Sequence, residues 1–525
     1  MREAGAALLT RSTPGAAFLV ITPARASSSL VVWSAALLAA GLIVLRSFVF
    51  LQYEQADFDA DQAIVGLMAT HLAEGRAWPL FFYGQLYMMG VQAWMAALVF
   101  LLTGPTVLAL KLPLLLVNIV TASLLVWLLV REAGLRAWQA LVASAWFTLL
   151  PPVTASRMVQ AQGGTIEPLL YALLLWLLRA RPVAFGLLFA FGFLHREFTL
   201  FGVAAILIVE VATGELFTRR RAAHWLLVVL VFTGARQSVT MLRHTASMFG
   251  PDAPPPRLAD GVTNVDLVAR SVCLVPGHIA GNVWWLATHN VPTFFGVQAQ
   301  PAGALIHSRQ PTGQPWAAVP LGAAVVIVFG LALRGWRRWL PLLAPPPDPR
   351  GLLPLMLTCA GVLSLLGVAT GCDVRNLITI RYHLMLALAP VGLTSLAFVS
   401  GSGGPRLRAL MTAGIGVWSG AMVWSHVQLL HEYRTVPPPN AYRELADDLV
   451  AHGDRYGWAS YWVSYHVDFL SQERVQLSPT SAIRISDYAR QALRAGGDAV
   501  VVGSEPCGAG DASRKVGVWW VCRGK

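Results

Sequence analysis

Charged residues are scarce in this chain. They make up 13% of its 525 residues, whereas hydrophobic residues make up 56%. A soluble protein has roughly twice that charged fraction. Cysteine is also rare, with five residues, and none of them lies in a CxxC pair or at a cysteine–histidine spacing typical of a metal site. These shortages argue against an ordinary water-soluble protein and against a cysteine-based metal domain.

Long apolar runs fill most of the chain instead. Some reach the ~20 residues that cross a bilayer, and others are shorter and would need tilt or neighbouring helices. The net charge of +12 comes mainly from arginines in short loops between these runs, as at Arg219–Arg221. This is the positive-inside pattern, which orients helices, so it does not indicate nucleic acid as a partner. We predict a polytopic α-helical membrane protein in contact with the lipid bilayer.

Placing every basic loop in the cytoplasm gives one consistent threading of about eleven transmembrane helices. A stretch at 87–102 is too short and amphipathic for a span and is expected at the outer membrane surface. Residues 1–29 form a cytoplasmic tail, and 30–430 form the transmembrane domain with outer loops at 53–105 and 237–316. The predicted helices cover residues 30–52, 106–130, 138–155, 166–180, 182–194, 198–212, 222–236, 317–333, 352–371, 380–399 and 408–428.

The composition changes at Val436, where the prolines Pro437–Pro439 form a stiff linker. Polar helix patterns then occur at 442–452 and 487–495, and short β-like runs at 458–461, 499–502 and 516–521. The pattern predicts a small α/β domain over 431–525, on the outer face.

The threading places four cysteines outside the membrane. Cys507 could pair with Cys522, and Cys273 with Cys372, if the compartment oxidises thiols. Cys359 lies in the middle of a predicted helix and is expected to be an inert core residue.

An acidic run follows the first apolar stretch directly, with Asp57, Asp59 and Asp61. Carboxylates at a bilayer edge coordinate an ion, accept a proton or pair with a cation. The simpler alternative is a solvated loop in which Asp61 is the N-cap of a helix over 62–71, and Asp57 by itself is expected to be solvated. We favour Asp61 as a general base, with Asp59 as its support or as the alternative base. A Mg²⁺ or Mn²⁺ ion bound by Asp59 and Asp61 is a further hypothesis, and no other cofactor is expected.

Further polar side chains fall at the same outer level of the threading. Arginines neutralise a phosphate through bidentate hydrogen bonds, and a carboxylate takes the proton of an incoming hydroxyl, so such a set suits a lipid-phosphate substrate. Each also has a simpler interpretation: a structural ion pair, an arginine that snorkels to the interface, or a carboxylate favoured at a helix N-terminus. The residues are Glu167, Arg196, Glu197, Arg375, Arg381 and Tyr382.

The stretch Asp61–Ala69, followed by Glu74 and Gly75, resembles the first outer loop of the GT-C superfamily of membrane glycosyltransferases. The branch it resembles most contains the protein mannosyltransferases and the lipid A aminoarabinose transferase. Ile166–Pro168, Phe193–Arg196 and Arg381–Leu384 resemble later motifs of that family in the same order. The resemblance covers roughly residues 30–400. Gln62 and Glu167 stand where the family usually has Glu and Asp, which leaves their roles open.

The resemblance implies transfer of a hexosyl or pentosyl unit from a polyprenyl-phosphate donor to a glycan, lipid or protein acceptor. The reaction would take place on the outer face of a bacterial inner membrane. Arg196 and Arg381 would hold the leaving phosphate, Tyr382 would donate a hydrogen bond, and Glu167 and Glu197 would contact the substrate. Two alternatives are a transporter or flippase for lipid-linked sugars and a non-catalytic scaffold. A transporter should show internal repeats and ionisable groups near helix midpoints, and neither pattern is visible.

Overall fold

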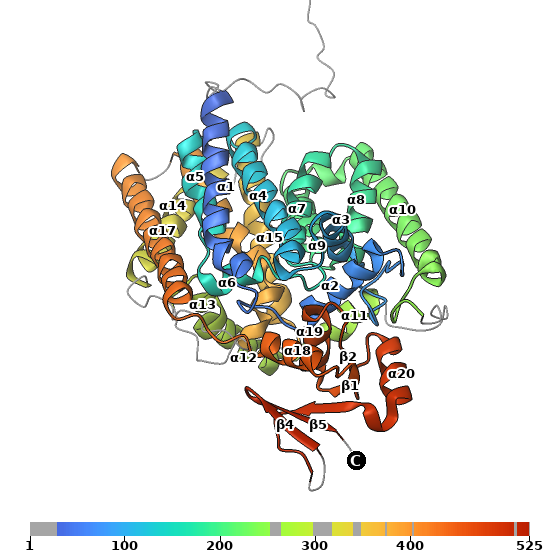
Figure 1. The fold of residues 1–525 in the computed structure, drawn as a ribbon. Helices are drawn as coiled ribbons and strands as arrows, with labels where there is room; N and C mark the ends of the chain where they lie inside the picture. The colour runs from blue at the N-terminus through green and yellow to red at the C-terminus, as the bar shows by residue number, and fades with distance from the viewer. Residues whose placement is uncertain are drawn as a thin grey trace, which may run out of the picture.

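The computed structural model describes residues 29–252, 264–297, 318–339, 348–372, 375–401, 404–508 and 512–523. They form a mostly helical body, with a small five-stranded sheet at one end of it (Figure 1). The helices of the body are α1 (Ser29–Gln52), α2 (Ala60–Ala73), α3 (Val91–Thr103), α4 (Val107–Arg131), α5 (Ala137–Thr148), α6 (Pro152–Arg157), α7 (Glu167–Leu178), α8 (Pro182–His195), α9 (Thr199–Ala212), α10 (Arg219–Met241), α11 (Asn264–Ser271), α12 (Pro276–Trp285), α13 (Val291–Phe294), α14 (Ala318–Trp339), α15 (Leu352–Ala369), α16 (Leu388–Val399) and α17 (Gly404–Thr435).

Four helices within these described ranges are long and apolar enough to cross a membrane, namely α1, α4, α10 and the helix over Pro349–Ala369 that contains α15. Five shorter apolar helices accompany them, as the pattern of long and short runs predicted. Apolar side chains remain exposed on the outside of the body, and such surface is stable only against lipid or another apolar partner. The architecture is that of a membrane-embedded helical protein, and the number of about eleven spans stays a prediction.

Two predicted helices differ from the observed ones because of proline. The predicted helix over 138–155 is divided into α5 and α6 at Pro151 and Pro152, which cannot donate the backbone hydrogen bonds of a continuous helix. The predicted helix over 380–399 begins only at Leu388, after two short 3₁₀ segments. Pro390 fits the first turn of α16 but would interrupt a helix that started at residue 380.

The C-terminal part contains α18 (Ala441–Ala451), β1 (Tyr456–Ala459), α19 (Tyr461–Leu470), β2 (Gln476–Pro479), α20 (Ser486–Ala495), β3 (Val500–Gly503), β4 (Ala512–Val516) and β5 (Trp519–Arg523). The strand order is β2-β1-β3-β5-β4, with β1 parallel to β2 and β3 and with β5 antiparallel to β3 and β4. The sheet bears out the predicted α/β character. The predicted single run over 516–521 contains the last residue of β4, a two-residue turn and the first half of β5, with Gly517 in the turn at a positive φ of 57°.

Helix α19 was missed by the sequence analysis because its residues, rich in aromatic and β-branched side chains, favour a strand. It is helical because it packs on α2, where tertiary contact outweighs intrinsic propensity. Gly66 on α2 faces Phe469 on α19 so closely that a Cβ atom at Gly66 would lie 2.4 Å from the Phe469 ring. The C-terminal part is therefore packed directly against the segment that follows α1.

A network of hydrogen-bonded polar side chains also stabilises this interface. His71 on α2 is fully buried, with Nδ1 2.9 Å from the Tyr83 hydroxyl and Nε2 3.0 Å from Glu473 Oε1. Arg76 also donates to the Glu473 carboxylate. Burial disfavours the ionised form of Glu473, but hydrogen bonds from His71 and Arg76 outweigh it and lower the pKa of Glu473 to about 2.

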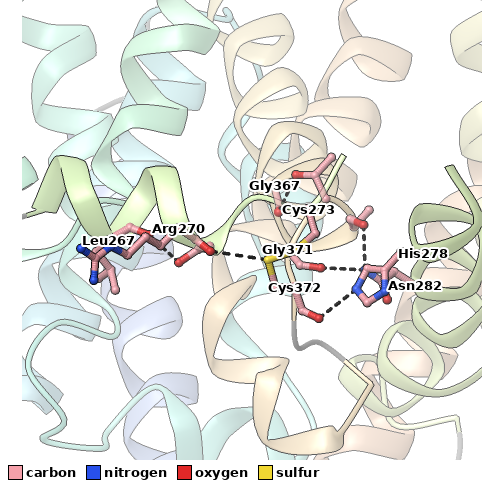
Figure 2. The surroundings of a disulfide bond; sticks show 11 residues. Leu267, Arg270, Cys273, His278, Asn282, Gly367, Gly371 and Cys372 are labelled. Atoms are coloured by element: carbon pink, nitrogen blue, oxygen red, sulfur yellow. Dashed lines mark hydrogen bonds between the residues drawn. A yellow bond between two sulfur atoms is a disulfide. The ribbon is translucent and has the colours of Figure 1, made fainter. Parts of the chain in front are cut away.

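Both cysteine pairs allowed by the threading are disulfides, Cys273–Cys372 and Cys507–Cys522, and Cys359 is a half-buried free thiol. The first disulfide joins the segment between α11 and α12 to the end of α15 (Figure 2). His278 Nε2 on α12 lies 2.8 Å from the Cys372 carbonyl oxygen, and Asn282 Nδ2 donates to the Gly371 carbonyl at 2.9 Å. Side-chain hydrogen bonds thus reinforce the covalent link.

Candidate functional site

Helix α2 begins immediately after the acidic run, and Asp59 is its N-cap. Asp59 Oδ1 accepts a hydrogen bond from the Gln62 amide nitrogen at 3.0 Å. The prediction of Asp61 as the N-cap was therefore wrong, because the helix begins at Ala60 and a cap precedes the first helical residue. Asp61 lies in the first turn instead, and its side chain is left for other contacts.

Asp57 is buried, so the prediction that it is solvated was wrong. Its side chain accepts a hydrogen bond from Gln160 Nε2 at 2.8 Å and lies 3.5 Å from Arg157 Nη1. Its backbone has a positive φ of 56°, a conformation that Asp tolerates better than most residues. Gln62 is also buried and donates to the Asp57 carbonyl at 2.9 Å. Asp57 and Gln62 thus fix the loop against the segment that follows α6.

Lys111 on α4 binds the backbone of the same loop. The residue is fully buried, and its Nζ donates to the carbonyl oxygens of Phe50, Ala56 and Asp57 at 3.0–3.1 Å. A buried ammonium group requires such partners. Lys111 was not predicted as a site residue because it lies inside a long apolar run. A charged residue within such a run was itself the available signal.

Asp61 lines a cavity of about 110 Å³ together with Arg196, Arg381 and Tyr382. These residues come from α2, from the turn between α8 and α9, and from the 3₁₀ segment Leu377–Tyr382. The structure therefore brings four of the predicted site residues to one place. The remaining lining residues are Phe82, Gln85, Tyr87, Met88, Gln162, Gly164 and Thr165.

The two arginines of the cavity have few acceptors. Arg381 donates to Gln162 Oε1 and to the Tyr382 hydroxyl, both at 2.9 Å, and its Nε has no hydrogen-bond partner. Arg196 donates to Met88 Sδ at 3.0 Å, and its Nε lies 3.8 Å from Glu197 Oε1. A guanidinium group carries several N–H donors that match a phosphate or carboxylate. Both side chains can therefore bind an anion in the cavity.

Gln162 connects the acidic run to Arg381. Its Nε2 donates to Asp59 Oδ2 at 2.5 Å, and its Oε1 accepts from Arg381. Burial and the neighbouring Asp61 carboxylate raise the pKa of Asp59 to about 7. Gln162 was not predicted as a site residue. It precedes Gly163 and Gly164, whose positive φ values of 78° and 111° mark a tight loop.

Tyr461 joins the C-terminal part to this site. Its hydroxyl donates to Asp61 Oδ1 at 2.7 Å. The sequence offered no signal for this contact, because residues 61 and 461 are brought together only by the packing of α19 on α2.

Glu167 and Arg375 lie outside the cavity lining. The Glu167 carboxylate is buried and accepts from Gln92 Nε2 at 2.8 Å and from the Thr165 amide at 2.9 Å. Gln92 in turn accepts from the Gly163 amide, so Glu167 supports the glycine loop. Arg375 is exposed and donates to Asn282 Oδ1 at 3.2 Å, near the Cys273–Cys372 disulfide. The Glu197 carboxylate lies 3.8 Å from Arg196 Nε, as the ion-pair interpretation predicted, and Glu197 is not among the residues that line the cavity.

Within the described parts of the chain, no group of three or more His, Cys, Asp or Glu side chains is arranged to hold a metal ion. Asp59 and Asp61 would offer two carboxylates, but both oxygens of Asp59 accept hydrogen bonds from Gln62 and Gln162, and Oδ1 of Asp61 accepts one from Tyr461. The hypothesis of a divalent cation gains no support from this geometry.

No protein-family model and no curated protein matches the chain. Among solved structures it is similar to ArnT from Cupriavidus metallidurans bound to undecaprenyl phosphate, with a TM-score of 0.52 and 12% identity over 94% of this chain and 97% of that one. The apo state of the same protein gives a TM-score of 0.42 and 12% identity over 94% of this chain and 98% of that one. ArnT is an aminoarabinose transferase of the GT-C superfamily, so the predicted resemblance is confirmed at the level of the fold.

Proposed function

We propose that the protein is a membrane glycosyltransferase that moves a sugar from a polyprenyl-phosphate donor to an acceptor hydroxyl. The reaction takes place at the outer face of a bacterial inner membrane. The observation that carries this proposal is the cavity in which the Asp61 carboxylate faces Arg196, Arg381 and Tyr382. It combines a group that accepts a proton with groups that bind a phosphate.

In the proposed reaction, Asp61 takes the proton of the acceptor hydroxyl. The acceptor oxygen forms a bond to the anomeric carbon of the sugar, and the bond between that carbon and the phosphate oxygen breaks. The polyprenyl phosphate leaves with the electron pair and is bound by Arg381 and Arg196, whose charge stabilises the leaving group. General-base catalysis of this kind contributes roughly 10²–10⁴-fold to a rate.

Gln162 and Tyr382 complete the arrangement. Gln162 holds Arg381 beside the acidic run, and the Tyr382 hydroxyl accepts from Arg381 Nη2 and keeps its own proton for a phosphate oxygen. The Arg381 guanidinium group is thereby oriented before substrate binds, which lowers the entropy lost on binding.

The fold comparison supports the donor class. The similar ArnT structure holds undecaprenyl phosphate, a polyprenyl phosphate, and the likeness extends over nearly the whole length of both chains. The two disulfides support the outer face, because such bonds persist where thiols are oxidised.

The proposal is tested in a deletion strain complemented with the wild-type protein or with Asp61→Asn, at matched membrane levels. We expect the deletion to lose a surface glycan or glycolipid that only the wild type restores, and the missing sugar identifies the acceptor. Equal restoration by Asp61→Asn would exclude Asp61 as the base. An unchanged set of surface glycans in the deletion strain would contradict the transferase.

A further inference from the structure

The C-terminal part supplies a side chain to the proposed catalytic carboxylate. We propose that Tyr461 is a positioning residue, whose hydroxyl holds Asp61 in the orientation that accepts the proton. This inference rests on the proposed function. It makes the C-terminal α/β domain a contributor to the site, since α19 supplies the residue that holds Asp61.

The contact is direct and well defined. The Tyr461 hydroxyl lies 2.7 Å from Asp61 Oδ1 and is half-buried at the start of α19. Burial and the charge of Asp61 raise the pKa of Tyr461 well above its ordinary value, so the phenol keeps its proton and donates it. The hydrogen bond occupies one carboxylate oxygen. The other, Oδ2, is left for the acceptor hydroxyl.

Tyr461 is itself fixed by its surroundings. The Arg484 guanidinium group lies 6.0 Å from the centre of the Tyr461 ring, and Arg484 Nη1 donates to the Gly84 carbonyl at 3.2 Å. Gly66 against Phe469 holds α19 close to α2, as described above. The position of the Tyr461 hydroxyl therefore depends on the whole interface between α2 and α19, and not on its side chain alone.

The charged groups around the pair agree with this role. Asp59 lies two residues before Asp61, at the N-cap of α2, and Arg381 lines the same cavity as Asp61. Arg381 is needed for the phosphate, so it is not free to orient the carboxylate as well. A neutral donor such as a phenol orients Asp61 without cancelling the charge that makes it a base.

The test compares Tyr461→Phe with Tyr456→Phe, a matched loss of one hydroxyl on the neighbouring strand β1 outside the cavity lining. We expect Tyr461→Phe to lower the rate of glycan restoration in the complemented strain by about tenfold or more, the loss typical of a hydrogen bond to a charged group. Binding of undecaprenyl phosphate to the purified full-length protein should stay within about twofold of wild type. Tyr456→Phe should behave as wild type in both measurements.

A second measurement separates a positioning role from a loss of fold. The shift in unfolding temperature caused by Tyr461→Phe should become smaller when Asp61 is already Ala, because the hydrogen bond that the two residues share is then absent in both proteins. Additive shifts, or a Tyr461→Phe variant as active as wild type while Asp61→Asn is inactive, would overturn the inference and leave the proposed function intact. An active Asp61→Asn variant would instead exclude Asp61 as the base, and this inference would fall together with that part of the proposed function.

Discussion

Asp57 and Asp61 lie within one acidic run, yet Asp57 is buried against Gln160 and Arg157 while Asp61 faces the cavity. Two carboxylates so near in sequence therefore have different tasks. One fixes the loop, and the other is available for chemistry. Substitution of each should affect a different measurement.

Asp61→Asn should reduce sugar transfer by at least about 10²-fold, because an amide cannot accept the proton of the acceptor hydroxyl. The unfolding temperature in detergent should change little, since Asn still accepts a hydrogen bond from Tyr461. Activity is measured as glycan restoration at matched membrane levels. Retained activity would point to Asp59 as the base.

Asp57→Asn should destabilise the protein by about 1–3 kcal/mol, the cost of weakening a buried hydrogen-bonded charge. Asn tolerates the positive φ at this position, so the substitution adds no backbone strain to the measured loss of stability. The variant is checked by thermal unfolding in detergent, and its activity per folded molecule should be near that of wild type. A large loss of activity without a loss of stability would contradict the structural role.

Arg381→Gln should weaken the binding of undecaprenyl phosphate by about 10- to 100-fold, because a charged hydrogen bond contributes about 1.5–3 kcal/mol. Arg375→Gln is the matched control, since Arg375 is exposed and lies outside the cavity. Equilibrium binding to the two purified variants tests the difference. If both bind the lipid phosphate equally well, the cavity is not the phosphate site.

Stability should depend on pH through Asp59. Its pKa is about 7 in the folded protein and near 4 in the unfolded chain, so between these values the folded state binds the extra proton. The free energy of unfolding therefore falls as the pH rises from about 4 to 7. Asp59→Asn keeps an oxygen to cap Gln62, and its unfolding temperature should decrease less over this range than that of wild type. Parallel curves would show that Asp59 titrates normally.

Thiol titration should count one reactive cysteine in the unfolded protein without reductant and all five after reduction, since Cys359 alone lies outside the two disulfides. The protein is purified from membranes without reductant and with its free thiol left unmodified. Cys273→Ser should leave two thiols, Cys359 and Cys372. Five thiols without reductant would place the cysteines in a reducing compartment and contradict the outer face.

The transmembrane helices could be predicted from the sequence because lipid requires long apolar segments, and α1, α4 and α15 lie close to their predicted ranges. The proximity of Asp61, Arg196 and Arg381 could also be predicted. Placing the basic loops in the cytoplasm set all three residues at the outer level of the membrane. Their catalytic roles stay predictions.

Contacts that depend on packing between distant segments could not be predicted. Tyr461 reaches Asp61 only because α19 is a helix on α2, and the local sequence of α19 favours a strand. Gln162 lies in a loop with no periodicity, so nothing in the pattern points to Asp59 or Arg381. Proline separates α5 from α6 and delays the start of α16. Since Pro151 and Pro390 are visible in the sequence, both helix boundaries could have been predicted from it.

The close approach of Gly66 to Phe469 also has an evolutionary consequence. Any larger side chain at position 66 requires the ring at 469 to shrink or move, so the two positions should vary together among homologous chains. A lineage that exchanged its C-terminal domain for an unrelated one would be released from this constraint, and residue 66 would then drift away from glycine. The identity of this one residue should therefore report whether a relative has kept the same domain over its site.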